Sequence, residues 1–536
     1  MVYVPSAQDI NHWGQFRIII NWNTKMKNKI SKVSILLLAY VISSFMISAC
    51  NDIIDLEPES ELTPANFWKQ QDDAIAALAG VYVELKWLAG SWGDWRNGLF
   101  LMNMGDIRAD MIKSSWGSQC CMVSLVDLNI QVVSPDNAYT EWGHFYSLIN
   151  RANNVIAFLP NIVREDPNFT ETEMKALQGE AYFLRAFAYF NIAKWWKDAP
   201  LITEAVTSVE QNLEVAKNTQ EELLNQAEAD LEQALSNGYL QTNVPSKGRA
   251  TIYAGYALQT ELFLWRGKYQ QAADAAANVM AGPFQLPNSY WSNFWGGGST
   301  SETIFEAYFT GQNGDYSFMS KVGSWEPGFI QLYDRAEPFT KLVQASGDYE
   351  QPGQVEYNYT GRGYHGYGQK YWWWADSRVW KWSGLDDTNL KPAETDDTEY
   401  PIYRLADVML MRAEALNRAS NGGNVEEVMA LVNKVRARAK VPSASAPDGA
   451  TMFEIENIIM DERAIELSVE GKRWFDLMRA SKGRPDYLVN KVLQKYPEDQ
   501  RAAVRARIEN PESWYVPINR RELQLNPALV QNPYYN

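Results

Sequence analysis

Residues 250–280 constrain the fold of this 536-residue chain more than any other segment. Their sequence, ATIYAGYALQTELFLWRGKYQQAADAAANVM, carries small and apolar residues at helical spacing on both sides of a glycine, Gly267. This pattern predicts two helices joined by a tight turn, with Tyr269 packed at the turn. Small side chains would let the two helices approach closely, and they belong to Ala254, Ala257, Ala272 and Ala275.

This helical hairpin resembles a tetratricopeptide repeat, a unit of about 34 residues. The same pattern recurs over residues 403–439. Apolar residues at spacings of three and four also predict a long amphipathic helix over residues 171–197. Further helices are expected at 73–86, 138–159 and 220–235. The repeats are irregular and interrupted, so we expect a mainly α fold in which helical hairpins form an embedded scaffold.

Three long segments interrupt the scaffold, at residues 87–136, 281–400 and 481–520. They are rich in Gly, Pro, Trp, Tyr and Asn and show little helical period. Loops of this length inside a compact domain usually carry function. The segment 281–400 is too large to be one loop, so we expect short strands and local helices within it. We expect one domain over residues 62–536, with this insert.

The N-terminal region has the pattern of an export signal. Four lysines between residues 25 and 32 precede an apolar run at residues 33–47. The run is shorter than the roughly 20 residues of a membrane-spanning helix and has the length of a secretory h-region. We therefore expect a signal peptide over residues 1–49, with Met26 as its natural start and residues 1–25 as an over-extended beginning.

The sequence Ile47-Ser48-Ala49-Cys50 resembles the lipobox of bacterial lipoproteins, in which the cysteine is acylated. Acyl chains on Cys50 would anchor the protein stably to a membrane. Residues 50–61 would then form the lipidated cysteine and an acidic tether. The alternative is an ordinary signal peptide with an incidental cysteine.

Composition excludes several classes of function. The net charge of −16 argues against a nucleic-acid partner and against adhesion to anionic lipid. Only His144 and His365 follow the expected signal, which argues against a histidine zinc site or a Ser-His-Asp centre. We expect no cofactor, although Asp and Asn side chains in loops could hold a structural calcium ion. The adjacent Cys120 and Cys121 are a reduced pair or a vicinal disulfide.

Five segments, in order, resemble the SusD/RagB family of surface glycan-binding lipoproteins of Bacteroidetes. They are DLEPESELTPANFWKQQDDAIAALAGVY at 55–82, GEAYFLRAFAYFNIAKWWKDAPLIT at 179–203, YPIYRLADVMLMRAEALNRA at 400–419, IIMDERAIELSVEGKRWFDLMR at 458–479, and the C-terminal WYVPINRRELQLNPALVQNPYYN. Tyr534 stands where the family more usually has glycine. The resemblance spans essentially the whole chain after the expected signal, whereas the loops between the segments follow no shared pattern.

The resemblance implies a SusD-like fold and a non-catalytic protein, lipid-anchored at the outer membrane and facing the cell exterior. Its partner would be a SusC-like TonB-dependent transporter, to which it would deliver oligosaccharides or polysaccharide. A lid that binds peptides or glycopeptides is an alternative, and a lipid-anchored glycoside hydrolase is another.

Aromatic residues are the surplus in this chain, with 21 tryptophans and 28 tyrosines. The C–H face of a sugar ring stacks on Trp or Tyr, while its hydroxyl groups need polar partners. In the family, glycan-contacting aromatics come from the early excursion and from the insert after the middle helices. The residues implied here are Trp92, Trp95, Tyr290, Trp291 and Trp325 for stacking, and Asp94, Arg96 and Asn97 for hydroxyl groups. For each tryptophan the alternative is packing against the helical scaffold.

Glu466 and Glu470 lie one helical turn apart and raise the possibility of a glycosidase carboxylate pair. Arg463, Lys472 and Arg473 are close in sequence and would lower the pKa values of both carboxyl groups. A general acid needs the opposite environment. We therefore interpret this segment as an ion-paired helix face that supports the fold, and we predict no catalytic residues and no metal site.

Overall fold

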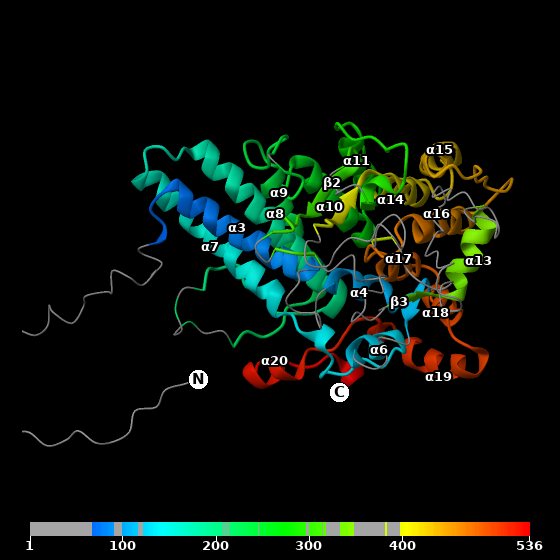
Figure 1. The fold of residues 1–536 in the computed structure, drawn as a ribbon. Coiled ribbons are helices and arrows are strands. Elements are labelled where there is room, and N and C mark those ends of the chain that lie inside the picture. Colours follow the sequence, from blue (N-terminus) through cyan, green and yellow to red (C-terminus); the bar gives the residue numbers. More distant parts are fainter. Residues whose placement is uncertain are drawn as a thin grey trace, which may run out of the picture. The chain divides into compact units, whose positions relative to one another are not determined.

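The computed structural model describes residues 67–90, 99–115, 122–206, 208, 211, 214–244, 246–295, 300–312, 315–317, 333–347, 381–382 and 397–536. Contacts divide the chain into two units, residues 1–63 and 64–536, and all described residues belong to the second unit. Helices dominate this unit, and two short two-stranded sheets complete its described part (Figure 1). The prediction of a mainly α fold is confirmed.

Four long helices pack in sequence order in the first half of the unit (Figure 1). They are α3 (Gln71–Ala89), α7 (Gly143–Glu165), α8 (Glu171–Trp196) and α9 (Gln220–Leu235). Helices α8 and α9 begin at threonine caps, Thr170 and Thr219, each with a glutamate three residues later that completes a capping box. These local signals explain why the helix starts were readable from the sequence.

The predicted hairpin at residues 250–280 is confirmed as α10 (Ile252–Arg266) and α11 (Tyr269–Met280). Gly267 ends α10 in the left-handed conformation, with φ of 75°, which glycine adopts without steric cost. Helix α11 packs against α14 (Leu405–Ala419), which is followed by α15 (Val425–Arg438). Two helical hairpins therefore lie together although 120 residues of insert separate them in sequence.

The two sheets are antiparallel pairs. Strand β2 (Thr303–Ala307) pairs with β4 (Tyr400–Arg404), with Ala307 opposite Tyr400 and a register irregularity between Thr303 and Glu306. Strand β1 (Ile112–Ser114) pairs with β3 (Tyr333–Arg335). The insert at 281–400 also carries α12 (Ser292–Trp295) and α13 (Glu337–Ser346), as expected for a segment too long to be one loop.

The expectation that residues 481–520 lack helical structure is wrong. They contain α18 (Tyr487–Leu493), α19 (Glu498–Ile508) and the 3-10 helix η5 (Pro511–Trp514). Helix α19 buries only Val504 and Ile508, four residues apart, and is otherwise polar. So short an apolar stripe leaves little signal in the sequence.

The remaining elements are short or belong to the C-terminal half. They are α4 (Phe100–Asp106), α6 (Val123–Asn129), η1 (Ala138–Thr140), α16 (Met452–Glu466), α17 (Arg473–Ala480), α20 (Arg520–Leu525) and η6 (Pro533–Tyr535).

In the part of the chain that the structure describes, no helix has both the length and the apolar character that crossing a bilayer requires. The expected signal peptide, Met26, the lipidation site Cys50 and the acidic tether lie outside the described residues. The same is true of Cys120 and Cys121.

Helix α4 packs against the turn that precedes α17, and two glycines make this approach possible. A Cβ atom on Gly105 would lie 1.9 Å from the carbonyl oxygen of Gly471. The neighbouring buried carboxyl group of Asp106 accepts hydrogen bonds from the backbone N–H of Gly471 at 2.6 Å and of Arg473 at 3.3 Å. The junction therefore joins segments more than 360 residues apart.

We predict that Gly105→Ala lowers the free energy of unfolding by about 3 kcal/mol, because the added methyl group meets backbone that cannot move aside easily. The control is Gly143→Ala at the start of α7, where a Cβ atom meets nothing within 4 Å. Urea unfolding followed by circular dichroism measures both. Equal stability of the two variants would contradict the close approach.

A second prediction concerns the pH dependence of the same junction. Burial raises the pKa of Asp106 from 3.8 to about 7, although its two backbone donors oppose the shift. Between these values the folded state keeps a proton that the unfolded state releases, so the contribution of Asp106 to stability falls as pH rises. Asp106→Asn should therefore gain stability relative to the native chain between pH 4 and 7. Parallel pH profiles of the two unfolding free energies would contradict this.

Candidate functional site

A groove with a volume of about 340 Å³ runs along one side of α3. We call it the α3 groove. Its walls come from α3, from residues 246–249, which precede α10, and from the end of β2 with Tyr308. Three parts of the chain far apart in sequence thus meet along one helix.

The α3 groove carries exposed apolar side chains. Ile75 is 45% exposed, Val83 46% and Tyr308 40%. Ile75 and Val83 are eight residues apart on α3 and therefore share a face, while Ala74, Leu78 and Val81 are buried. Large apolar side chains that gather in one hollow of an otherwise polar surface mark a place for binding.

Charged side chains border the groove. Lys86 Nζ lies 2.6 Å from a carboxylate oxygen of Asp315, and both side chains are partly exposed. One helical turn earlier on α3, the hydroxyl of Tyr82 donates a hydrogen bond to Glu180, which pairs with Arg249. Burial and the negative charge of Glu180 raise the pKa of Tyr82 well above its usual value, so Tyr82 stays a neutral donor.

Two segments that carry predicted site residues leave the described structure at the Lys86 end of this groove. Residues 91–98 contain Trp92, Asp94, Trp95, Arg96 and Asn97, and they begin one helical turn after Lys86. Trp325 follows ten residues after Asp315, the ion-pair partner of Lys86. All six predicted residues lie outside the described residues, and the described chain brings their two attachment points together.

Sequence reasoning did not select Trp87, which follows Lys86 but does not line the groove. Its ring is half-buried and stacks on His144 of α7, with ring centres 5.8 Å apart and planes at 12°. Its signal was present, because Trp87 opens the aromatic-rich stretch KWLAGSWGDWRN. Tyr308 and Asp315 have no local signal, because only the tertiary structure brings them to α3.

The structure corrects the expectation that Tyr290 and Trp291 stack on a ligand. Their side chains are 2% and 3% exposed, so neither ring offers a face to the surface. The Tyr290 hydroxyl donates a hydrogen bond to the carbonyl of Glu466 at 3.1 Å, and the guanidinium of Arg438 lies 5.3 Å from its ring centre. For these two residues the alternative of packing against the scaffold holds.

Glu466 and Glu470, the considered carboxylate pair, are buried in a network of ion pairs. Arg404 Nη1 lies 2.8 Å from a carboxylate oxygen of Glu302 and 2.5 Å from one of Glu466, and Arg404 Nη2 lies 2.8 Å from one of Glu470. Arg438 pairs with both Glu302 and Glu466, and Lys381 with Glu470. We call these six side chains the Arg404 network. The interpretation of this segment as ion-paired is confirmed, but the cations that pair with the two glutamates are not the expected ones. Arg463 pairs with Asp407 and Asp476, Lys472 with Asp407, and Arg473 with Asp110.

The pKa directions agree with a structural role for the Arg404 network. Burial opposes the charge of Glu302, but Arg438 and Arg404 outweigh it and hold its pKa below the usual value. Burial lowers the pKa of Lys381 to about 8, against the attraction of Glu470. A glycosidase acid needs a raised pKa in a cleft, and these carboxylates sit in the interior.

In the part of the chain that the structure describes, no group of three or more His, Cys, Asp or Glu side chains is arranged to hold a metal ion.

Comparison with known protein families shows which family this chain belongs to. A model described as the SusD family matches residues 262–535, about half of the chain. The chain belongs to the SusD family. A second model, described as "Starch-binding associating with outer membrane", matches residues 103–264 of this SusD family member. The resemblance inferred from the sequence is confirmed.

Two relatives in the SusD family align with this chain over most of its length and most of their own. SusD-like protein P38 of Formosa agariphila is 28% identical over 511 residues, which cover 85% of this chain and 92% of the relative. A SusD-like protein of Bacteroides ovatus is 25% identical over 490 residues, covering 85% of this chain and 84% of the relative.

Solved structures share the fold. A SusD superfamily protein from Bacteroides vulgatus has a TM-score of 0.69 and 22% identity, covering 87% of this chain and all of the other. Surface glycan-binding protein A from Bacteroides uniformis has a TM-score of 0.67 and 20% identity, with 86% and 99% of the two chains covered. A laminarin binding SusD-like protein has a TM-score of 0.64 and 22% identity, with 87% and 99% covered.

We predict that Arg404→Met lowers the free energy of unfolding by about 3–5 kcal/mol, because it leaves buried carboxylates without their central cation. The matched control is Lys341→Met, which breaks the exposed ion pair with Glu337 in α13. Exposed pairs contribute little, so the control should unfold at the same urea concentration as the native chain. Native-like stability of Arg404→Met would contradict a supporting role for the network.

Proposed function

We propose that this SusD family member binds oligosaccharides or polysaccharide at the Lys86 end of the α3 groove. The observation that carries the proposal is the Lys86–Asp315 ion pair, because it joins the attachment points of residues 91–98 and of the segment that leads to Trp325. Trp92, Trp95 and Trp325 would supply stacking surfaces. Asp94, Arg96 and Asn97 would pair with hydroxyl groups.

The chemistry of the groove supports a sugar ligand. Its lining combines apolar side chains with the charged Lys86, Arg249 and Glu306, and an amphipathic sugar ring with hydroxyl groups on its rim requires both. A buried polar group left unpaired costs about 1–3 kcal/mol, so fixed polar groups such as Lys86 and Asp315 would select among sugars. Two of the structural neighbours are described as a laminarin binding and a surface glycan-binding protein, which adds support.

The proposal includes transport. The protein would be anchored through Cys50 at the outer membrane, facing the cell exterior, and would deliver glycans to a SusC-like TonB-dependent transporter. The family description that mentions association with the outer membrane supports this placement. Peptide or glycopeptide capture by the same groove is the alternative occupant.

Binding without cleavage is part of the proposal. Burial alone would raise the pKa of Asp315, but hydrogen bonds from Lys86 and from the backbone of Thr310 outweigh it and lower the pKa. An ionised, ion-paired carboxylate at the groove is suited to holding hydroxyl groups and unsuited to general acid catalysis.

We predict that Trp95→Ala weakens binding of a recognised oligosaccharide at least about ten-fold, because a stacking surface of this size contributes more than 1 kcal/mol. Lys86→Ala should weaken binding as well, since it frees Asp315 from α3. Lys341→Ala, which breaks an exposed ion pair outside the groove, is the matched control.

Calorimetry against plant, host and microbial oligosaccharides measures these affinities, and a reducing-end assay of the same samples tests for cleavage. Binding with no new reducing ends supports the proposal. New reducing ends would overturn it, and so would unchanged affinity in both groove variants.

A further inference from the structure

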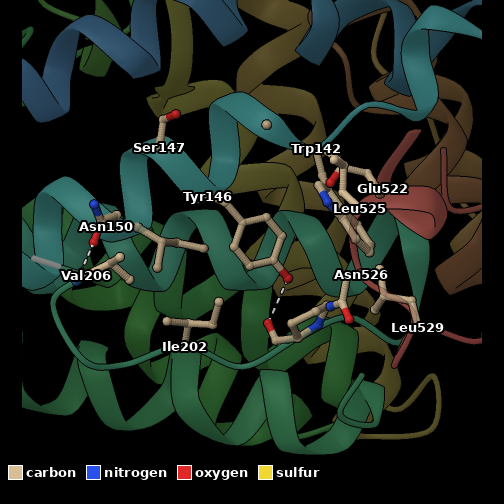
Figure 2. A pocket seen from close by; sticks show the side chains of 13 residues that line it. Trp142, Tyr146, Ser147, Asn150, Ile202, Val206, Glu522, Leu525, Asn526 and Leu529 are labelled. Carbon is tan, nitrogen blue, oxygen red and sulfur yellow. Dashed lines mark hydrogen bonds between the residues drawn. The ribbon is translucent and has the colours of Figure 1, made fainter. Parts of the chain in front are cut away.

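A second hollow lies between α7 and α20, and nothing in the family resemblance assigns it a role (Figure 2). We call it the α7–α20 pocket. Its walls come from the first turns of α7, from residues 200–206 and from α20 with the following residues up to Leu529. Its volume of about 490 Å³ falls in the range of roughly 300–1,000 Å³ that small-molecule sites occupy.

An aromatic ring stands at the centre of the pocket. Figure 2 shows Tyr146 between Trp142 and Ile202, with its hydroxyl donating a hydrogen bond to the carbonyl of Pro200 at 2.7 Å. Burial raises the pKa of the Tyr146 hydroxyl well above its usual value, so the phenol stays neutral. The bond to Pro200 holds the ring in place, so the pocket presents a fixed aromatic side chain.

Polar groups stand on two sides of this ring. Asn150 uses its side-chain oxygen to accept a hydrogen bond from the backbone N–H of Val206 at 2.9 Å, which leaves its amide nitrogen for a ligand. Ser147 lies beside Asn150, and Glu522 lies on the Trp142 side (Figure 2). Glu522 is the one charged side chain among the described residues that line the pocket.

Most of the rest of the lining is aliphatic, and Asn526 adds one amide group whose oxygen and nitrogen are hydrogen-bonded to the backbone of Ala528 and Val215. Ile149, Ile202, Leu525 and Leu529 contribute to the wall, and Leu525 remains 66% exposed. Such a wall is too apolar to suit a sugar with hydroxyl groups on every carbon, because those groups would lose hydrogen bonds to water without replacement. It suits a methyl group attached to a sugar ring.

We infer that the α7–α20 pocket is a second sugar subsite, which takes one neutral sugar residue bearing an apolar substituent such as a deoxy methyl, an O-methyl or an acetyl group. The Tyr146 ring stacks on the C–H face, and the aliphatic wall takes the substituent. Glu522 accepts a hydrogen bond from one hydroxyl, and Asn150 donates to another. Sugar acids are rejected, because Glu522 repels a second carboxylate and no cation lines the described wall.

This inference rests on the proposed glycan binding. Helix α7 turns His144 and Arg151 towards Glu84 of α3, and Gly143 and Ser147 towards the pocket. Helix α7 therefore packs on α3, the helix that lines the groove, and lines the pocket with other residues of the same turns. Two weak contacts on one polymer strengthen each other through effective concentration.

The test compares two exposed substitutions near the C-terminus. Leu525→Glu places a carboxylate in the pocket wall, and Val530→Glu, at a residue 63% exposed and outside the lining, is the matched control. Both sites are exposed, so both variants should fold. Saturation-transfer NMR on the purified full-length chain uses methyl rhamnoside and N-acetylglucosamine as probes, with glucose and glucuronic acid for comparison.

We expect saturation transfer to the methyl or acetyl protons of the first two probes and none to glucuronic acid. Leu525→Glu should reduce that transfer at least five-fold, while Val530→Glu leaves it unchanged. Equal signals from all four sugars, or equal signals in Leu525→Glu and Val530→Glu, would overturn the subsite.

The same samples separate this inference from the proposed function. Suppose that oligosaccharide binding measured by calorimetry depends on Trp95, and that the probe signals are unchanged in Leu525→Glu. This result would contradict the subsite and support the main site. Probe signals lost in Leu525→Glu, together with no Trp95-dependent oligosaccharide binding, would support the subsite and overturn the main site.

Discussion

The buried ion pairs around Arg404 connect the β2–β4 strand pair to the C-terminal ends of two helices. Arg404 ends β4, Glu302 precedes β2, Arg438 ends α15 and Glu466 ends α16. Burying six charges is expensive unless each finds partners, and here three cations face three carboxylates. The network therefore fixes β2 relative to the helical hairpins. Strand β2 runs into Tyr308, so the network also positions one wall of the α3 groove.

Local sequence signals explain how much of the fold was predictable. Apolar residues at helical spacing and the glycine turn at Gly267 predicted the scaffold helices, and the capping boxes at Thr170 and Thr219 fix where two of them begin. Helices α18 and α19 were missed, because α19 buries only two residues along an otherwise polar surface. The close approach of Gly105 to Gly471 could not be predicted from the sequence, for a different reason. No local pattern tells which backbone a small residue will meet 366 positions away.

In the candidate site, too, some features were predictable from the sequence and others depend on the tertiary structure. The sequence identified aromatic-rich stretches, but composition cannot separate an aromatic side chain on the surface from one in the core. Tyr290 and Phe294 lie four residues apart, with tilted rings whose centres are 5.0 Å apart in the interior near Arg404, so these aromatic side chains belong to the core. The Lys86–Asp315 pair spans 229 residues, and only folding reveals it. Residues 91–98 and Trp325 therefore stay predictions, now tied to one described end of the α3 groove.

The residues that hold the framework together are not the residues that could choose a ligand. The SusD family model matches residues 262–535, a range that contains every member of the Arg404 network. Those side chains are buried, so they report on the framework and have no surface with which to select a ligand. Ile75, Val83 and Lys86 on the α3 side of the groove lie outside both family matches, whereas Tyr146 lies within the second match, at residues 103–264. Relatives that share the framework are thus free to bind different glycans, and the ligand of this protein has to be inferred from the groove and the pocket themselves.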